Sequence, residues 1–254
     1  MDTPIVTPEN PLAPAAASSS VFVEKAAAEV RGSERFAGDP EADALLARTR
    51  ARIYHWPENF AGFRAELIVR EGVDEWHGSF QAVSSRDHRF ELLASTRPGG
   101  GDFAGEKWLR FQLEELLAHR EPPRVSGMVS RAGVVFGDED ATYGRQVVFQ
   151  GDKMGSYYRL KDHCITQIAR GYGGVRFVIN IDQHQDCGGR AAASSYTAVY
   201  RDAATGTLVR TETYLDRYEA VNGIWLPVER RYTEANATRT FTRQIVFGNV
   251  ALLL

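Results

Sequence analysis

The residues Thr211–Thr233 read TETYLDRYEAVNGIWLPVERRYT, and this stretch decides the fold. Apolar and polar residues alternate on both sides of the pair Asn222-Gly223. An Asn-Gly pair between two such runs is the strongest short signal of a β-hairpin, because a type I′ turn needs positive φ at both central residues. The stretch therefore predicts two antiparallel strands, Thr211–Val221 and Ile224–Thr233, joined by a tight turn.

Turn signals on either side extend this hairpin into a meander. Asp202–Gly206 links a strand over Tyr196–Arg201 to the strand that continues from Thr207, and its late glycine suits the left-handed position of a bulged loop. Glu234–Ala237 forms the next turn and precedes a strand over Arg239–Leu252. Four sequential strands with short connections predict one curved antiparallel sheet.

Upstream of the meander, alternating runs separated by glycine-containing turns predict further short strands. Together with the meander they give ten to twelve strands in an α+β fold with two or three helices. The upstream strands are expected at Phe63–Arg70, Trp76–Val83, Phe90–Ala94, Val125–Phe136, Tyr143–Gln150, Gly155–Lys161, Cys164–Arg170 and Val175–Asp182.

The segment Glu106–Arg120 is the clearest helix in the sequence. Its leucines at 109, 113, 116 and 117 form an apolar stripe that Trp108 and Phe111 widen. Such a stripe is expected to cover the concave face of the sheet. Asp39-Pro40 predicts the start of a second helix that ends before Pro57. A short third helix is expected over Ser20–Val30.

Composition is typical of a soluble globular protein, with 43% hydrophobic and 25% charged residues in 254. The net charge of −3 gives no global attraction to nucleic acid. The arginines at 230, 231, 239 and 243 are expected on a solvated face of the sheet. Residues 1–19 predict a disordered tail rich in proline, alanine and serine, and residues 20–254 a single β-rich domain.

The N-terminus lacks the basic and apolar regions of a secretory signal, and no apolar run reaches the roughly 18 residues of a spanning helix. A cytoplasmic location without a membrane span is therefore expected. Cys164 and Cys187 are expected to be free thiols, although a bridge between neighbouring strands stays open.

The residues around these cysteines include several metal-ligand types. His184 and Cys187 have an H-x-x-C spacing, and His163 precedes Cys164. Zinc prefers four such ligands. However, adjacent strand residues point to opposite faces, so a buried cysteine and a polar loop over 183–189 is the competing interpretation.

Asp182, His184 and Asp186 share one strand face if the strand continues that far, and a histidine between carboxylates is a possible general base. No nucleophile motif of the G-x-S-x-G type accompanies it. We expect a protein that is not an enzyme and has no cofactor.

Aromatic side chains crowd the predicted meander. Tyr196 and Tyr200 share one face of a strand, as do Tyr214 and Tyr218. These rings form either a filled core between sheet and helix or the lining of a cavity for an apolar ligand. The candidates for such a lining are Trp108, Phe111, Leu113, Leu117, Tyr196, Tyr214 and Trp225.

Several strings resemble an uncharacterised bacterial and chloroplast family that is catalogued as a domain of unknown function and is frequent in cyanobacteria. The resemblance covers roughly Pro40 to Leu254 and implies a fold and a cytoplasmic or stromal location, not a reaction. The strings are YHWPENFAGF at 54–63, Tyr200–Asp202 with Thr205-Gly206, Gly151–Gly155 followed by Tyr158, and Phe247–Asn249.

More distantly, Gly223–Pro227 is similar to the G-x-W-L-P strand of bacterial lipoprotein carriers. Those proteins are open β half-barrels with helices on the concave side, and they shuttle acyl chains. The resemblance implies a non-enzymatic carrier or binder of a hydrophobic small molecule or lipid. They are periplasmic, however, whereas this chain shows no export signal. The alternative is an accessory or structural subunit of a larger assembly, whose N-terminal tail docks a protein partner.

Overall fold

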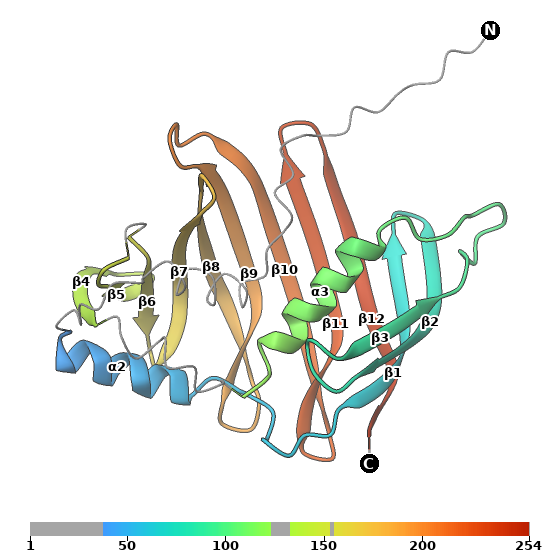
Figure 1. Cartoon of the computed structure of the whole chain (residues 1–254), viewed down its shortest axis with the longest axis horizontal. Helices are drawn as coiled ribbons and strands as arrows, with labels where there is room; N and C mark the ends of the chain where they lie inside the picture. The colour runs from blue at the N-terminus through green and yellow to red at the C-terminus, as the bar shows by residue number, and fades with distance from the viewer. Residues whose placement is uncertain (1–37, 123–132, 153–154, 254) are drawn as a thin grey trace, which may run out of the picture.

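The computed structural model describes residues 38–122, 133–152 and 155–253, which form one large antiparallel sheet with two helices. The sheet has twelve strands in the order β3-β2-β1-β12-β11-β10-β9-β8-β7-β6-β5-β4. Its edges, β3 and β4, do not pair with each other, so the sheet is open (Figure 1). The predicted antiparallel meander is confirmed, and it runs without interruption from β4 to β12.

The helices are α2 (Pro40–Ala51) and α3 (Glu106–Ala118). The strands are β1 (Phe63–Glu71), β2 (Asp74–Ala82), β3 (His88–Leu92), β4 (Val134–Asp140), β5 (Gly144–Phe149), β6 (Tyr157–Lys161), β7 (Cys164–Tyr172), β8 (Val175–Asp186), β9 (Ala191–Asp202), β10 (Leu208–Val221), β11 (Ile224–Asn236) and β12 (Thr240–Leu252).

The tight turn between β10 and β11 has the geometry that the sequence predicts. Asn222 has φ of 50° and Gly223 has φ of 83°, as a type I′ turn requires. The turn between β9 and β10 ends at Gly206, with φ of 72°, and the Asp202 carboxylate accepts hydrogen bonds from backbone N–H groups inside it. Both turns therefore fix the register of the meander.

Helix α2 begins as predicted. The Asp39 carboxylate accepts a hydrogen bond from Glu41 N at 2.8 Å, and Pro40 occupies the first helical position. Leu46 and Ala42 are buried against Val134 and other apolar residues of β4 to β7. We call this group the α2 core. Its buried members are Ala42, Leu46, Val134, Val147 and Leu160.

Helix α3 lies across β11 and β12 (Figure 1) and buries the predicted leucine stripe in a larger cluster, the α3 core. Leu109 and Leu113 have no exposed surface, and Leu116 and Leu117 have 1% each. They pack with Leu67, Phe80, Ile245, Phe247 and other buried residues of β1, β2 and β12. The helix ends two residues before the predicted Arg120, and His119 is its C-cap.

Four expectations differ from the structure or fall outside the residues that it describes. β8 continues to Asp186, so the polar loop expected over 183–189 is instead mostly strand. The strand expected at Val125–Phe136 begins at Val134, and residues 125–132 lie outside the described residues. The expected helix over Ser20–Val30 and the tail over 1–19 also lie outside them.

Neither α2 nor α3 has the length and apolar character needed to cross a bilayer.

Candidate functional site

The two cores are separated by a part of the same sheet face that belongs to neither. The pairing of β8 with β9 sets Phe177 opposite Tyr200, Ile179 opposite Ala198 and Ile181 opposite Tyr196. Tyr214 of β10 is in turn opposite Tyr196. Directly opposed residues share a face. We call these side chains, together with Glu212 and Asp216, the central strip.

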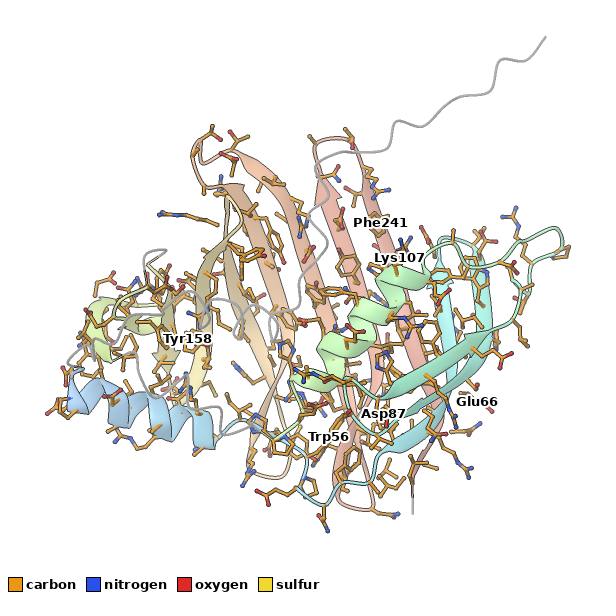
Figure 2. All side chains as sticks on the ribbon, viewed as in Figure 1. Trp56, Glu66, Asp87, Lys107, Tyr158 and Phe241 are labelled. Atoms are coloured by element: carbon orange, nitrogen blue, oxygen red, sulfur yellow. The ribbon has the colours of Figure 1, made fainter. Side chains whose placement is uncertain are left out.

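The strand pairing on either side of the strip shows that the strip lies on the sheet face that α2 and α3 cover. Tyr214 is opposite Tyr232 of β11, whose ring centroid is 5.6 Å from that of Trp108 on α3. On the other side, Ile179 is opposite Ile168 of β7, and Ile168 is opposite Tyr158, which packs against the α2 core (Figure 2). The strip therefore lies between the sheet regions covered by α2 and by α3.

Aromatic rings form a continuous row across the strip toward α3. The rings of Tyr196 and Tyr214 stack at 4.6 Å with an interplanar angle of 13°. Tyr214 meets Tyr232 edge to face at 5.2 Å. Such pairs stabilise beyond simple burial by about 0.5–1.5 kcal/mol each. The row is thus a fixed aromatic wall, with Trp108 at one end.

The tyrosine hydroxyls are occupied by carboxylates of β10. Tyr200 and Tyr214 donate to Glu212 Oε2 at 2.8 and 3.0 Å, and Arg210 Nε donates to Glu212 Oε1 at 2.8 Å. Burial, and then the Glu212 charge, raise the pKa of Tyr200 and of Tyr214. Both tyrosines are therefore neutral, with their hydroxyls bonded to Glu212. Their rings are also in contact, since the Arg210 guanidinium lies 3.9 Å from the centre of the Tyr200 ring and Tyr214 stacks on Tyr196.

A buried ion pair joins the strip to α3. Arg230 of β11 is 1% exposed and donates to both oxygens of Asp216, at 2.8 and 2.6 Å. It also donates to Gln112 Oε1 of α3 at 3.1 Å and to the Tyr196 hydroxyl at 2.9 Å. Burial disfavours the charged guanidinium, but Asp216 outweighs it and holds the pKa of Arg230 above its usual value. The expectation of a solvated Arg230 is wrong, because its partner lies across the strand pair.

The cavity candidates fall into different environments. Leu113 and Leu117 are packing residues of the α3 core, whereas Phe111 is half-buried. Trp108 packs against Phe103 and Tyr232 and under the Arg243 guanidinium, and its buried indole N–H has no acceptor among the described residues. Tyr196 and Tyr214 lie on the strip.

Trp225 lies apart from the strip, at the β11 end of the turn. Its ring packs against the α3 core. Its backbone N donates to the Tyr54 hydroxyl at 2.8 Å, and its carbonyl accepts from Trp56 Nε1 at 3.0 Å. Trp225 therefore holds the segment before β1 in place.

Within the described ranges, no three or more His, Cys, Asp or Glu side chains are grouped so as to hold a metal ion. His163 is exposed in the turn between β6 and β7, with φ of 60°. Cys187 is 3% exposed in the α3 core, and burial raises the pKa of its thiol to about 11. Cys187 and Cys164 are both free.

The possible general base is not supported by its neighbours. Register shifts between Ile181 and Gln183 and between Gln183 and His184 interrupt the alternation, so the three residues do not follow one regular strand face. Burial lowers the pKa of His184. Asp186 accepts a hydrogen bond from Gly189 N at 2.7 Å within the following turn.

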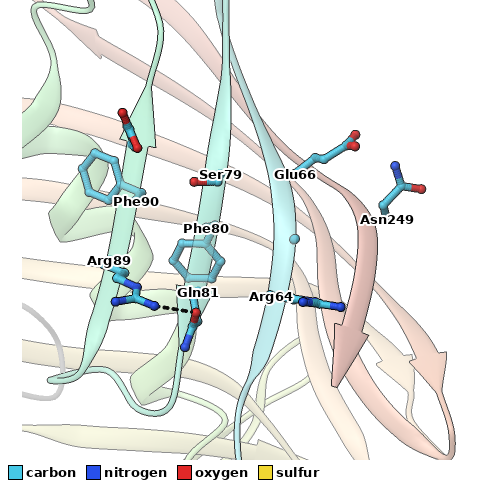
Figure 3. A pocket seen from close by; sticks show the side chains of 10 residues that line it. Arg64, Glu66, Ser79, Phe80, Gln81, Arg89, Phe90 and Asn249 are labelled. Atoms are coloured by element: carbon cyan, nitrogen blue, oxygen red, sulfur yellow. Dashed lines mark hydrogen bonds between the residues drawn. The ribbon is translucent and has the colours of Figure 1, made fainter. Parts of the chain in front are cut away.

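Two open hollows lie away from the strip. One, of about 620 Å³, is formed over β1, β2 and β3 (Figure 3). Its side chains include exposed Arg64 and Glu66, and Arg89 donates to Gln81 at 2.9 Å. The other, of about 590 Å³, is lined by residues of β1, β11, β12 and the β1–β2 turn. None of the seven cavity candidates lines either hollow.

The charged residues of the site were not among the sequence candidates, although a signal for them was present. Glu212, Tyr214, Asp216 and Tyr218 alternate along the decisive stretch, so both carboxylates share the face of the tyrosines. Charged residues on an apolar strand face indicate buried pairs.

Comparison with solved structures gives distant similarities over most of the chain. A LolA superfamily protein from Nitrosomonas europaea is 10% identical with a TM-score of 0.32, covering 84% of this chain and 94% of its own. A domain from Vibrio parahaemolyticus, described as an outer-membrane lipoprotein-sorting protein, is 13% identical with a TM-score of 0.37, covering 83% and 93%. A DUF1329 family protein from Desulfovibrio piger is 9% identical with a TM-score of 0.25, covering 84% and 92%.

A search of curated proteins gives no match. A family model does match, over residues 38–253, and it is described as a protein of unknown function, DUF3386. This span includes the strings at 54–63, 200–206 and 247–249 on which the resemblance to an uncharacterised family rested. The chain belongs to the DUF3386 family.

Proposed function

We propose that this protein is a non-enzymatic binder or carrier of a hydrophobic small molecule or lipid, held on the central strip at the concave side of an open half-barrel. The single observation that carries the proposal is the separation of the two cores. Among the described residues, neither core includes the half-buried apolar residues of the strip, which are Ile179, Ile181, Tyr196 and Tyr200. An apolar ligand bound on the strip would fill the space between the α2 core and the α3 core, so that one apolar surface runs across the sheet.

The chemistry of the strip supports an apolar ligand more than a polar one. Its aliphatic members, Ile179 and Ile181, offer no polar atoms, and its tyrosine hydroxyls are already bonded to Glu212 or to Arg230. Sites for small molecules are mostly apolar with a few placed polar groups. Ile179 and Ile181 are half-buried, so they remain within reach of another molecule.

A pair of charge insertions tests the proposal. Ile179→Glu places a carboxylate on the strip, whereas Leu215→Glu places one on the opposite face, where Leu215 is 45% exposed. Binding of a fluorescent fatty-acyl probe should weaken by about tenfold or more in Ile179→Glu, because burying a charge against an acyl chain is costly. Leu215→Glu should bind like the wild type. Equal binding by all three proteins, or none by the wild type, would overturn the proposal.

A further inference from the structure

Arg120 is a buried cation at the C-terminal end of α3. It is 4% exposed, its Nη1 donates to the Tyr54 carbonyl at 3.1 Å, and its guanidinium lies 5.1 Å from the centre of the Tyr218 ring. Its buried Nε has no hydrogen-bond acceptor among the residues that the structure describes. Within the same residues, no carboxylate forms an ion pair with Arg120.

Arg230, another buried arginine, has the counter-charge that Arg120 lacks. Arg230 is neutralised by Asp216, with both carboxylate oxygens engaged. Arg120 instead contacts the Tyr54 carbonyl and the face of the Tyr218 ring. It also lies at the C-terminal end of α3, where the helix dipole supplies about half a negative charge. Removing a full charge from water without a counter-charge is unfavourable by several kcal/mol, on the order of the cost of a broken buried ion pair. An anion beside Arg120 would remove that cost.

The positive charge of Arg120 acts on two neighbouring histidines. Burial, then the charges of Arg120 and Arg190, lower the pKa of His55 to about 4. His119 also lies in the field of Arg120, with the Glu115 carboxylate 3.9 Å from its Nε2. No ion pair within the described residues joins the Glu115 carboxylate to Arg120, so the Arg120 charge is left to attract a negative group from outside the chain.

Arg120 is also next to the central strip. The ring under its guanidinium, Tyr218, follows Asp216 on the same face of β10. We infer that Arg120 binds the carboxylate of a long-chain fatty acid, whose alkyl chain lies along the strip. This inference rests on the proposed function and adds the chemistry of the head group.

The geometry of the guanidinium favours this head group. Its Nη1 donates to the Tyr54 carbonyl, and its Nε has no acceptor among the described residues, so Nε is left to donate a charge-assisted hydrogen bond to a carboxylate. One unpaired positive charge is matched by one carboxylate charge.

The test uses three ligands on the full chain by isothermal titration calorimetry. They are dodecanoate, the uncharged dodecan-1-ol, and acetate, which is the head group alone. Wild-type protein should bind dodecanoate about tenfold or more tightly than the alcohol, because hydrogen bonds to a buried charge are strong. Arg120→Gln should remove that preference without changing the affinity for the alcohol, and Arg120→Lys should keep part of it. Arg64→Gln, an exposed arginine on the opposite face, is the matched control.

The outcomes separate the head-group site from the proposed function. Equal binding of acid and alcohol by the wild type would overturn the role of Arg120 and leave the carrier function intact. Acetate binding as tight as dodecanoate binding would show a simple anion site with no part for the strip. Binding of neither long-chain ligand would overturn both. The wild-type comparison decides the matter even if circular dichroism shows that Arg120→Gln does not fold.

Discussion

The Arg230–Asp216 pair connects three elements through one guanidinium, because Arg230 lies on β11, Asp216 on β10, and their partner Gln112 on α3. We expect Arg230→Met to lower the free energy of unfolding by about 3–5 kcal/mol, since it leaves Asp216 buried without its counter-charge. Urea unfolding followed by circular dichroism measures the loss.

The double variant Arg230→Met with Asp216→Leu is the matched control for this prediction. It should recover most of the lost stability, because replacing both charges by apolar groups removes the desolvation cost. If the losses from the two single substitutions simply add in the double variant, the two side chains act independently and the prediction is wrong.

His55 makes stability depend on pH. Burial, then Arg120 and Arg190, lower its pKa from 6.5 to about 4. The unfolded chain therefore binds a proton more readily than the folded protein does. The contribution of neutral His55 is complete above pH 6.5 and is lost as the pH falls toward 4. We expect His55→Gln to lose less stability than the wild type between these values.

Thermal melting of both proteins from pH 8 to pH 4 checks this expectation. At pH 8 the histidine is uncharged in both states, so the difference between the two proteins there gives the cost of the substitution that is independent of pH. A difference that stays constant down to pH 4 would show that His55 does not contribute.

At the scale of elements, α3 is held to the sheet by its leucine stripe. Leu113 has no exposed surface and packs in the α3 core, whereas Phe111 is half-buried. Leu113→Ala should therefore lower the free energy of unfolding by about 2–5 kcal/mol, through lost burial and a residual cavity. Phe111→Ala should have a clearly smaller effect. Denaturant unfolding of both variants measures the difference, and equal losses would place Phe111 in the core as well.

The elements themselves were largely predictable because their signals are local. The leucine stripe, the Asp39-Pro40 helix start and the Asn222-Gly223 turn each depend on residues within a few positions, and all three are confirmed. The end of β8 was missed because its register shifts depend on pairing with β9, which local alternation does not reveal.

The candidate site was predictable only in part, because it depends on pairing across several strands. Tyr196 and Tyr214 were identified as aromatic residues of the sheet, but their neighbours Ile179 and Ile181 come from β8, which only the strand register places beside them. Arg120 carried no sequence signal, since a basic residue at a helix end is common. Its lack of a counter-charge is visible only in three dimensions.

At the scale of the whole molecule, one sheet carries two cores of unequal size. Within the described residues, the α3 core has nineteen buried members and the α2 core five. The α2 core also contributes one edge of the sheet, through β4. Regions with less buried apolar surface open at lower free energy.

We therefore expect α2 and strands β4 to β6 to open before β1, β11 and β12 do, although the sheet is continuous. Native-state hydrogen exchange at increasing urea below the unfolding transition measures this order. Amides of β4 to β6 should exchange at a lower free energy of opening, and Leu46→Ala should lower it further without changing β11. Leu46→Ala and Leu113→Ala should also add in global stability, because they lie in different cores. If both regions exchange at one common free energy of opening, the sheet couples the two cores into one cooperative unit. Opening of the α2 side alone would then not expose the central strip.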